Sequence, residues 1–182
     1  MGVPYGLVIG VPLLAVSIFL LMQPDHLTLK QSIFVQAEPR DVFTILRNPR
    51  ILPKLARQVH TVLIEKETVD SQGISHLALS IREAVALLGN VTYLTNTVQD
   101  PKKLRTSSSS EPLLWGLIQF NSSWSFTSIV KQGYSGTIVT IDYSMNSPWA
   151  FIKLYEDKIA GNLKHMLKSC KKFGEVLSRK TL

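Results

Sequence analysis

The chain has 182 residues, of which 45% are hydrophobic, and it carries a net charge of +7 at pH 7. This length suits one domain with a real hydrophobic core, together with one extra segment. The only cysteine, Cys170, excludes an internal disulfide, and its place on an apolar stripe predicts a small core residue.

The chain opens with an uncharged run over residues 3–22, rich in Leu, Val and Ile. About twenty such residues are what one crossing of the hydrocarbon core requires, so we predict a transmembrane anchor over residues 1–24. A cleaved signal peptide is the alternative. No basic segment precedes the run, and Leu21-Met22-Gln23-Pro24 lacks the small residues of a cleavage site.

The charges after this run predict which side of the membrane the remaining chain occupies. Lys30 and Arg40 follow within about twenty residues, so the positive-inside rule places the domain in the cytosol. Two glycosylation sequons, at Asn90 and Asn121, indicate the opposite side if they are used. About one such match is expected by chance, so we predict a single-pass membrane protein with a cytosolic domain.

The soluble part begins with a strand and two short helices. Residues 27–36 are strand-like, with β-branched and aromatic residues at their centre. Glu38-Pro39-Arg40-Asp41 begins a short helix, which Asn48-Pro49 ends. A second helical turn is expected over residues 51–56.

A long series of strands follows. The strands expected from alternation and turn residues are 59–69, 74–88, 91–99, 104–109, 114–130 and 137–144. The fifth of these, 114–130, is too long for one straight strand, so we expect a bend or bulge at residues 121–123.

The last segment, residues 148–182, has the three-and-four spacing of one amphipathic helix. Ser147 is its expected cap, and Pro148 is expected in its first turn. Five of the seven net positive charges lie from Pro148 onward. Such a basic face suits an anionic partner, either lipid headgroups or nucleic acid, or is simply a solvated helix face.

This order, β-α-α-β6-α, predicts an α+β domain with one long antiparallel sheet. The opening of the first helix (Ala37 to Phe43), the Asp100-Pro101-Lys102-Lys103-Leu104 turn, Trp124-Ser125-Phe126 and Gly136-Thr137-Ile138-Val139-Thr140 complete the pattern. Over residues 27–182 the chain resembles the START-like (SRPBCC) helix-grip superfamily, which includes polyketide cyclase-like and coenzyme Q-binding proteins. The resemblance implies a seven-stranded sheet curved around the C-terminal helix, with an apolar cavity between them.

Such a cavity would hold a lipid or another apolar small molecule. The side chains expected to face it from the strands and the final helix are Leu77, Leu79, Ile81, Trp124, Phe126, Val139, Ile141, Tyr143, Tyr155, Ile159, Leu163 and Met166. The alternative is that these side chains simply fill the core. The first hypothesis for function is a membrane-anchored protein that binds or transfers this ligand without making or breaking a bond.

A cyclase-like or hydratase-like enzyme in the same cavity is the rival hypothesis. Glu83 and Tyr143 would supply an acid and a phenol for proton transfer, although an exposed Glu83 and a packed Tyr143 are the favoured reading. The four histidines are scattered without zinc-site spacing, and no phosphate-binding loop is present, so we expect neither a metal nor a cofactor. Aromatic residues do not alternate with the lysines, so a membrane, through the anchor and the basic helix face, is favoured over nucleic acid.

Overall fold

The computed structural model describes residues 19–85, 88–131 and 133–178. Its elements, in chain order, are β1 (Pro24–Val35), α2 (Pro39–Leu46), the 3-10 turn η1 (Pro49–Ile51), α3 (Leu52–Leu55), β2 (Val59–Val69), β3 (Ser75–Val85), β4 (Gly89–Asp100), β5 (Arg105–Ser110), β6 (Gln119–Lys131), β7 (Tyr134–Pro148) and α4 (Trp149–Ser178). The predicted order, one strand, two short helices, six strands and a long helix, is confirmed.

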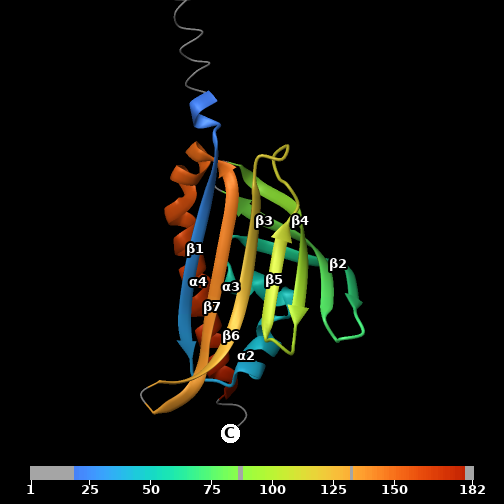
Figure 1. The fold of residues 1–182 in the computed structure, drawn as a ribbon, viewed down its shortest axis with the longest axis vertical. Helices are drawn as coiled ribbons and strands as arrows, with labels where there is room; N and C mark the ends of the chain where they lie inside the picture. The colour runs from blue at the N-terminus through green and yellow to red at the C-terminus, as the bar shows by residue number, and fades with distance from the viewer. Residues whose placement is uncertain (1–18, 86–87, 132, 179–182) are drawn as a thin grey trace, which may run out of the picture.

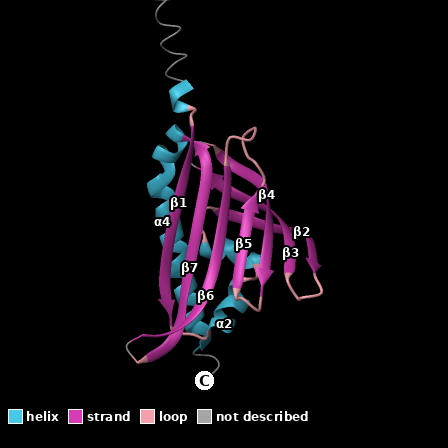
Figure 2. Cartoon of the chain, in the orientation of Figure 1, coloured by secondary structure: helices cyan, strands magenta, loops and turns pink. Residues whose placement is uncertain are grey.

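The strands form one seven-stranded antiparallel sheet in the order β1-β7-β6-β5-β4-β3-β2. Consecutive strands β2 to β7 pair as a meander, and β1 adds to the far edge beside β7. Figures 1 and 2 show α4 running along one face of the sheet, behind β1 and β7. Its closest approach to the sheet is at β1, and towards β2 to β4 it stands further off, where the side chain of Met166 still packs against the cluster of Leu77, Leu79 and Ile81.

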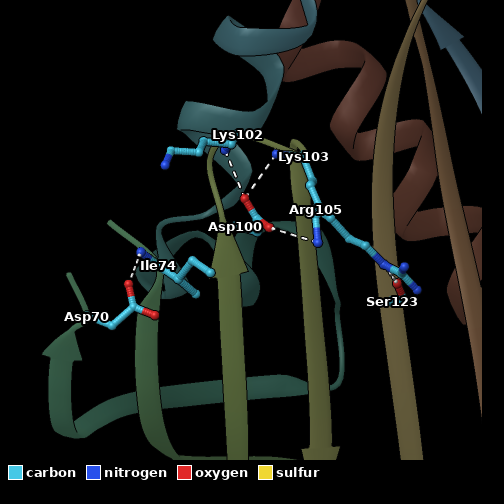
Figure 3. A network of polar contacts seen from close by, with 7 residues as sticks. All are labelled: Asp70, Ile74, Asp100, Lys102, Lys103, Arg105 and Ser123. Atoms are coloured by element: carbon cyan, nitrogen blue, oxygen red, sulfur yellow. Dashed lines mark hydrogen bonds and ion pairs between the residues drawn. The ribbon is translucent and has the colours of Figure 1, made fainter. Parts of the chain in front are cut away.

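Aspartate side chains close two of the hairpins (Figure 3). The Asp70 carboxylate accepts backbone hydrogen bonds from Gln72 at 2.8 Å and Ile74 at 2.9 Å. The Asp100 carboxylate accepts the N–H groups of Lys102 and Lys103, each at 3.0 Å. Each side chain replaces a backbone acceptor within the turn, which is why Asp is favoured there.

The bulge expected at residues 121–123 as one of two possibilities, a bend or a bulge, is not present. Strand β6 keeps an unbroken register with β7 from Gln119 to Lys131. The irregularity lies just before it, where a Leu113–Ile118 bridge closes a loop whose residues Leu114, Trp115 and Gly116 all have positive φ. Register shifts occur instead in β2, between Val59 and Thr61 and between Ile64 and Lys66. The long apolar stretch was therefore a loop followed by a strand without a bulge.

The start of the last helix also differs from the prediction. Pro148 pairs with Pro24 and ends β7, so α4 begins one residue later at Trp149. The Trp149 N–H donates to the Gln23 carbonyl at 2.8 Å, which ties the first turn of α4 to the segment before β1. The predicted anchor lies mostly in residues 1–18, outside the described residues, and no helix within the described part is long and apolar enough to cross a membrane. The anchor stays a prediction.

The core lies between the sheet, α4 and α2. Val35, Val139 and Ile141 are fully buried at its centre. Cys170 is also buried, as expected, and burial raises the pKa of its thiol to about 12. A thiol with so high a pKa stays protonated and unreactive near neutral pH.

A glycine marks the closest approach of α4 to β1. A Cβ at Gly174 would collide with the fully buried side chain of Val35, whereas a Cβ at Gly161 would meet nothing. We expect Gly174→Ala to lower the free energy of unfolding by about 1–3 kcal/mol through overpacking. Gly161→Ala, the matched control, should raise it by up to about 1 kcal/mol through helix propensity. Urea denaturation monitored by circular dichroism checks both, and equal effects at the two positions would contradict the close approach.

Candidate functional site

A cavity of about 600 Å³ lies between α4 and the concave face of the sheet. Strands β3, β4, β6 and β7 supply most of its sheet wall, and α4 supplies the opposite wall from Phe151 to Met166. Residues Leu52 and Ala56 of the α3 region close one side. The volume is within the usual range for ligand pockets, about 300–1,000 Å³.

Most of the side chains predicted to face a ligand line this cavity. These are Leu79, Ile81, Trp124, Ile141, Tyr143, Tyr155, Ile159, Leu163 and Met166. They come from three strands and the middle of α4. Strand alternation and the apolar stripe of the helix therefore both predicted the correct face of these elements. Whether these residues bind a ligand remains a prediction.

Leu77, Phe126 and Val139 do not line the cavity, which corrects that part of the prediction. Phe126 and Val139 are direct cross-strand partners, and Phe126 packs edge-to-face on Phe43 of α2 with ring centroids 5.7 Å apart. Leu77 is buried in the cluster beneath α3. These side chains do point inward, but the two short helices cover that end of the sheet and fill the space.

Small hydroxyl side chains, which were not among the predicted lining residues, form part of the sheet wall. Thr97, Ser108 and Ser122 face the cavity in one cross-strand row over β4, β5 and β6. The hydroxyls of Thr97 and Ser108 are 2.9 Å apart. Because these side chains are small, they do not project into the cavity, and its volume stays open. The only indication of these residues in the sequence was the alternation of polar residues along β4. Such a pattern is typical of an outer face, and only the curvature of the sheet shows that these side chains face the cavity.

Thr95, two residues before Thr97 on β4, also faces the cavity. Its side chain is only 2% exposed, and its Oγ1 has no hydrogen-bond partner among the described residues. A buried hydroxyl without a partner costs about 1–3 kcal/mol, so this atom is suited to pair with a polar atom of a bound molecule.

A carboxyl and two phenols form a second polar group on the wall. Glu83, Tyr93 and Tyr143 all line the cavity. Burial raises the pKa of Glu83, and a hydrogen bond from the Tyr93 phenol opposes that rise. Burial also raises the pKa values of Tyr93 and Tyr143, as does the nearby Glu83 carboxylate. The expectation of a solvent-exposed Glu83 is therefore wrong, because β3 carries it into the cavity on the same face as Leu79 and Ile81.

Aromatic rings connect this polar group to the wall around it. Phe120 packs edge-to-face on Tyr93 at 5.2 Å and stacks on Tyr143 at 6.2 Å between centroids. On α4, Tyr155 stacks on Phe151 at 4.2 Å, and Lys158 Nζ lies 5.3 Å from the centre of the Tyr155 ring. The rings hold the phenols in place and leave the cavity predominantly apolar.

The cavity reaches the surface beside α4. Lys158, Gly161 and Asn162 line it and are exposed, and Leu88 lines it from the β3–β4 hairpin. Leu113 and Leu114 of the β5–β6 loop line it as well. The mouth is therefore bounded by two hairpin loops and one flank of the helix. Within the described residues, no three His, Cys, Asp or Glu side chains are grouped as a metal site.

The raised pKa of Glu83 predicts a pH-dependent stability. The folded protein holds this proton above the usual value near 4.5, so it binds more protons than the unfolded chain, and stability falls as pH rises through that window. We expect Glu83→Gln to gain stability relative to the natural chain at about pH 8 and not at about pH 4. Denaturation curves at the two pH values measure this difference, and a gain that is the same at both would contradict a buried, titrating carboxyl.

No family model matches the sequence, and no curated protein matches it. Solved structures do resemble the fold. The di-domain aromatase/cyclase BexL of the BE-7585A biosynthetic pathway aligns with a TM-score of 0.63 at 13% identity, over 82% of this chain and 50% of BexL. The chain thus spans about half the length of that protein.

Two further matches cover nearly the whole of the other chain. The Zhui aromatase/cyclase from Streptomyces sp. R1128 aligns with a TM-score of 0.64 at 13% identity, over 83% of this chain and 94% of Zhui. A START superfamily protein from Mycobacterium smegmatis aligns with a TM-score of 0.61 at 14% identity, over 84% of this chain and 99% of that chain. The START-like helix-grip fold predicted from the sequence is confirmed.

Proposed function

We propose that this protein binds a largely apolar small molecule or lipid in the cavity between the sheet and α4. The observation that carries the proposal is the cavity itself, about 600 Å³ lined mainly by aliphatic and aromatic side chains. An empty volume of this size forfeits the packing energy that a filled core would supply, and a bound apolar molecule restores it. The START-like and cyclase neighbours support this use of the fold.

The polar atoms of the wall narrow the chemistry of the ligand. Thr95 Oγ1 has no hydrogen-bond partner among the described residues, and the Glu83 carboxyl, whose pKa burial raises, lines the cavity with Tyr93 and Tyr143. Hydroxyl and carboxyl groups form hydrogen bonds with hydroxyl or carbonyl oxygens of a ligand. The proposed ligand is therefore an apolar body that carries one or two such oxygens.

The proposed setting is a membrane. The uncharged run over residues 3–22 is long enough for one crossing, and it leads directly into β1 at Pro24. A domain attached next to a bilayer is close to the source of such ligands, so transfer to and from lipid is the proposed role. We place the domain on the cytosolic side, from Lys30 and Arg40.

Extraction of the purified full chain tests the binding. The protein is purified in detergent from a eukaryotic host, and bound molecules are extracted and identified by mass spectrometry. We expect a co-purifying lipid or polycyclic molecule with hydroxyl or carbonyl oxygens. A cavity that is consistently empty and takes up neither fluorescent fatty acids nor fluorescent sterols would overturn the proposal.

A cyclase-like or hydratase-like activity is the second candidate. The observation that favours it is Glu83 in the cavity, with a raised pKa and two phenols nearby, which suits proton transfer to or from a carbonyl compound. Product analysis after incubation with the extracted ligand distinguishes the candidates. Conversion that is lost in Glu83→Gln, with binding retained, supports the enzyme, whereas recovery of the unchanged ligand supports the carrier.

A further inference from the structure

One end of the sheet carries a group of exposed apolar residues. Because the strands alternate in direction, the start of β1, the β3–β4 hairpin, the β5–β6 loop and the start of α4 all lie at this end (Figure 1). The exposed apolar side chains there are Phe19, Leu20, Leu21, Met22, Leu88, Trp115, Leu117 and Trp149. We call this set the apical ring.

Trp115 is the most exposed member of the ring. It is 97% exposed at the tip of the β5–β6 loop. Leu114, Trp115 and Gly116 have φ values of +48°, +57° and +88°, and a left-handed conformation costs a non-glycine residue about 1–2 kcal/mol. No packing within the described chain offsets this cost for Trp115, since almost none of its surface is covered. A strained loop that presents a bare tryptophan indicates a contact outside the domain.

Three observations indicate that this contact is a lipid bilayer. The uncharged run of residues 3–22 ends at this same end of the sheet, with residues 19–22 exposed beside β1. Tryptophan and tyrosine are enriched at the membrane–water interface, and the two exposed tryptophans Trp115 and Trp149 lie in the ring, against the single Tyr134 at the opposite end. Part of the rim of the cavity mouth is also here, since Leu88, Leu113 and Leu114 line the cavity, while the flank at Lys158, Gly161 and Asn162 lies further along α4.

The opposite end of the sheet exposes apolar residues too, but it lacks these features. Val69, Val130 and Tyr134 are exposed in the β2–β3 and β6–β7 hairpins. No described residue of either hairpin lines the cavity, and β1 begins at the other end of the sheet, where Pro24 pairs with Pro148. Exposed apolar residues alone therefore do not identify a docking surface. Their combination with the uncharged N-terminal run and the cavity mouth does.

We propose that the apical ring docks on the bilayer, with the Trp115 loop inserted at the interface and the cavity mouth opening towards lipid. The long axes of the strands and of α4 then stand away from the membrane surface. Lys168 is nineteen residues beyond Trp149 on α4, roughly 30 Å along the helix. That distance is nearly four Debye lengths at physiological salt, so the lysines of α4 from Lys168 onward are too far away to provide the attachment. The inference rests on the proposed membrane attachment and not on the identity of the ligand.

Site-directed labelling of the full chain tests the docking. The native thiol of Cys170 is buried with a raised pKa, so an introduced exposed cysteine is labelled selectively by a polarity-sensitive fluorophore. Three variants are compared in phosphatidylcholine vesicles: Trp115→Cys in the ring, Val69→Cys at the opposite end, and Lys168→Cys on the basic helix face. Lipids with a spin label near the glycerol end of the acyl chain serve as quenchers.

We expect the label on Trp115→Cys to shift to shorter wavelength and to be quenched by the spin-labelled lipid, with the other two labels unchanged. Leu117→Cys should behave as Trp115→Cys does, which guards against a local effect of removing the tryptophan. Equal quenching at residues 115 and 69, or stronger quenching at residue 168, overturns the docking. A shift at residue 115 without lipid quenching also overturns it, since a second copy of the chain then covers the loop.

Vesicle flotation separates this failure from failure of the attachment. A chain that floats with vesicles while residue 115 is not quenched is attached in another orientation, so only the docking is overturned. A chain that does not float overturns the attachment and the docking together. An empty cavity in the extraction experiment overturns ligand binding and leaves the quenching result as it stands.

Discussion

Ser122→Phe is expected to weaken ligand capture about tenfold or more, which corresponds to about 1.4 kcal/mol of binding free energy. Ser122 lies in the row of small hydroxyl residues on the sheet wall, directly opposite Tyr143 on β7 and Ser108 on β5. A phenyl group there projects into the volume that the ligand would occupy. It also buries apolar area of its own, so the fold should keep its stability.

The matched control is Ser125→Phe on the same strand. Ser125 does not line the cavity, and by alternation it lies on the opposite face of β6. Uptake of a fluorescent fatty acid, measured by titration, should fall for Ser122→Phe and stay unchanged for Ser125→Phe. Unchanged uptake in both variants, with both proteins folded by circular dichroism, would mean that the ligand does not occupy this cavity.

Leu163→Asp is expected to lower the free energy of unfolding by about 3–5 kcal/mol. Leu163 is 6% exposed, belongs to the central core cluster and also lines the cavity. The substitution removes a buried aliphatic group and introduces a carboxylate without a partner, and both changes are costly. Such a loss is a large share of the total stability of an ordinary domain, about 5–15 kcal/mol.

Two controls separate the effect of the buried position of residue 163 from the effect of introducing a carboxylate. Leu163→Met conserves volume and apolar character, so its cost should stay below about 1.5 kcal/mol. Lys164→Asp places the same carboxylate one residue further along α4 on an exposed position, where substitutions usually stay within about 0.5 kcal/mol. Urea denaturation gives all three values. A loss at Lys164 as large as the loss at Leu163 would mean that the buried face of α4 is assigned wrongly.

Periodicity was sufficient to predict the architecture of this domain. The two-residue alternation of the strands and the three-and-four spacing of α4 both depend on burial against one face, and burial was the dominant constraint on both. The limit of β6 was missed because Leu113 to Ile118 are as apolar as a strand. Three residues of this stretch, Leu114, Trp115 and Gly116, have a left-handed backbone. Of these only Gly116 is a residue type that indicates such a conformation.

The cavity was predicted only in part, for a different physical reason. Alternation identifies the side of the strand on which Leu79 or Phe126 lies, but it does not say what lies above that side chain. Phe126 meets α2, whereas Leu79 faces open volume, and the difference depends on where two short helices lie across a curved sheet. Thr95 and Ser122 were missed because a small polar residue on a strand is typical of an outer face.

The pairing of the first strand with the last sets the order in which this fold can form. Strands β1 and β7 are joined by contacts between residues more than one hundred positions apart, from Val35 with Thr137 to Pro24 with Pro148. Closing so long a loop is entropically costly, whereas the meander from β2 to β7 needs only adjacent hairpins. We expect the meander to form early and β1 to join last, so refolding is slow relative to hairpin formation. During synthesis β1 emerges first, next to the uncharged run of residues 3–22. It stays unpaired until β7, near the far end of the chain, has been made.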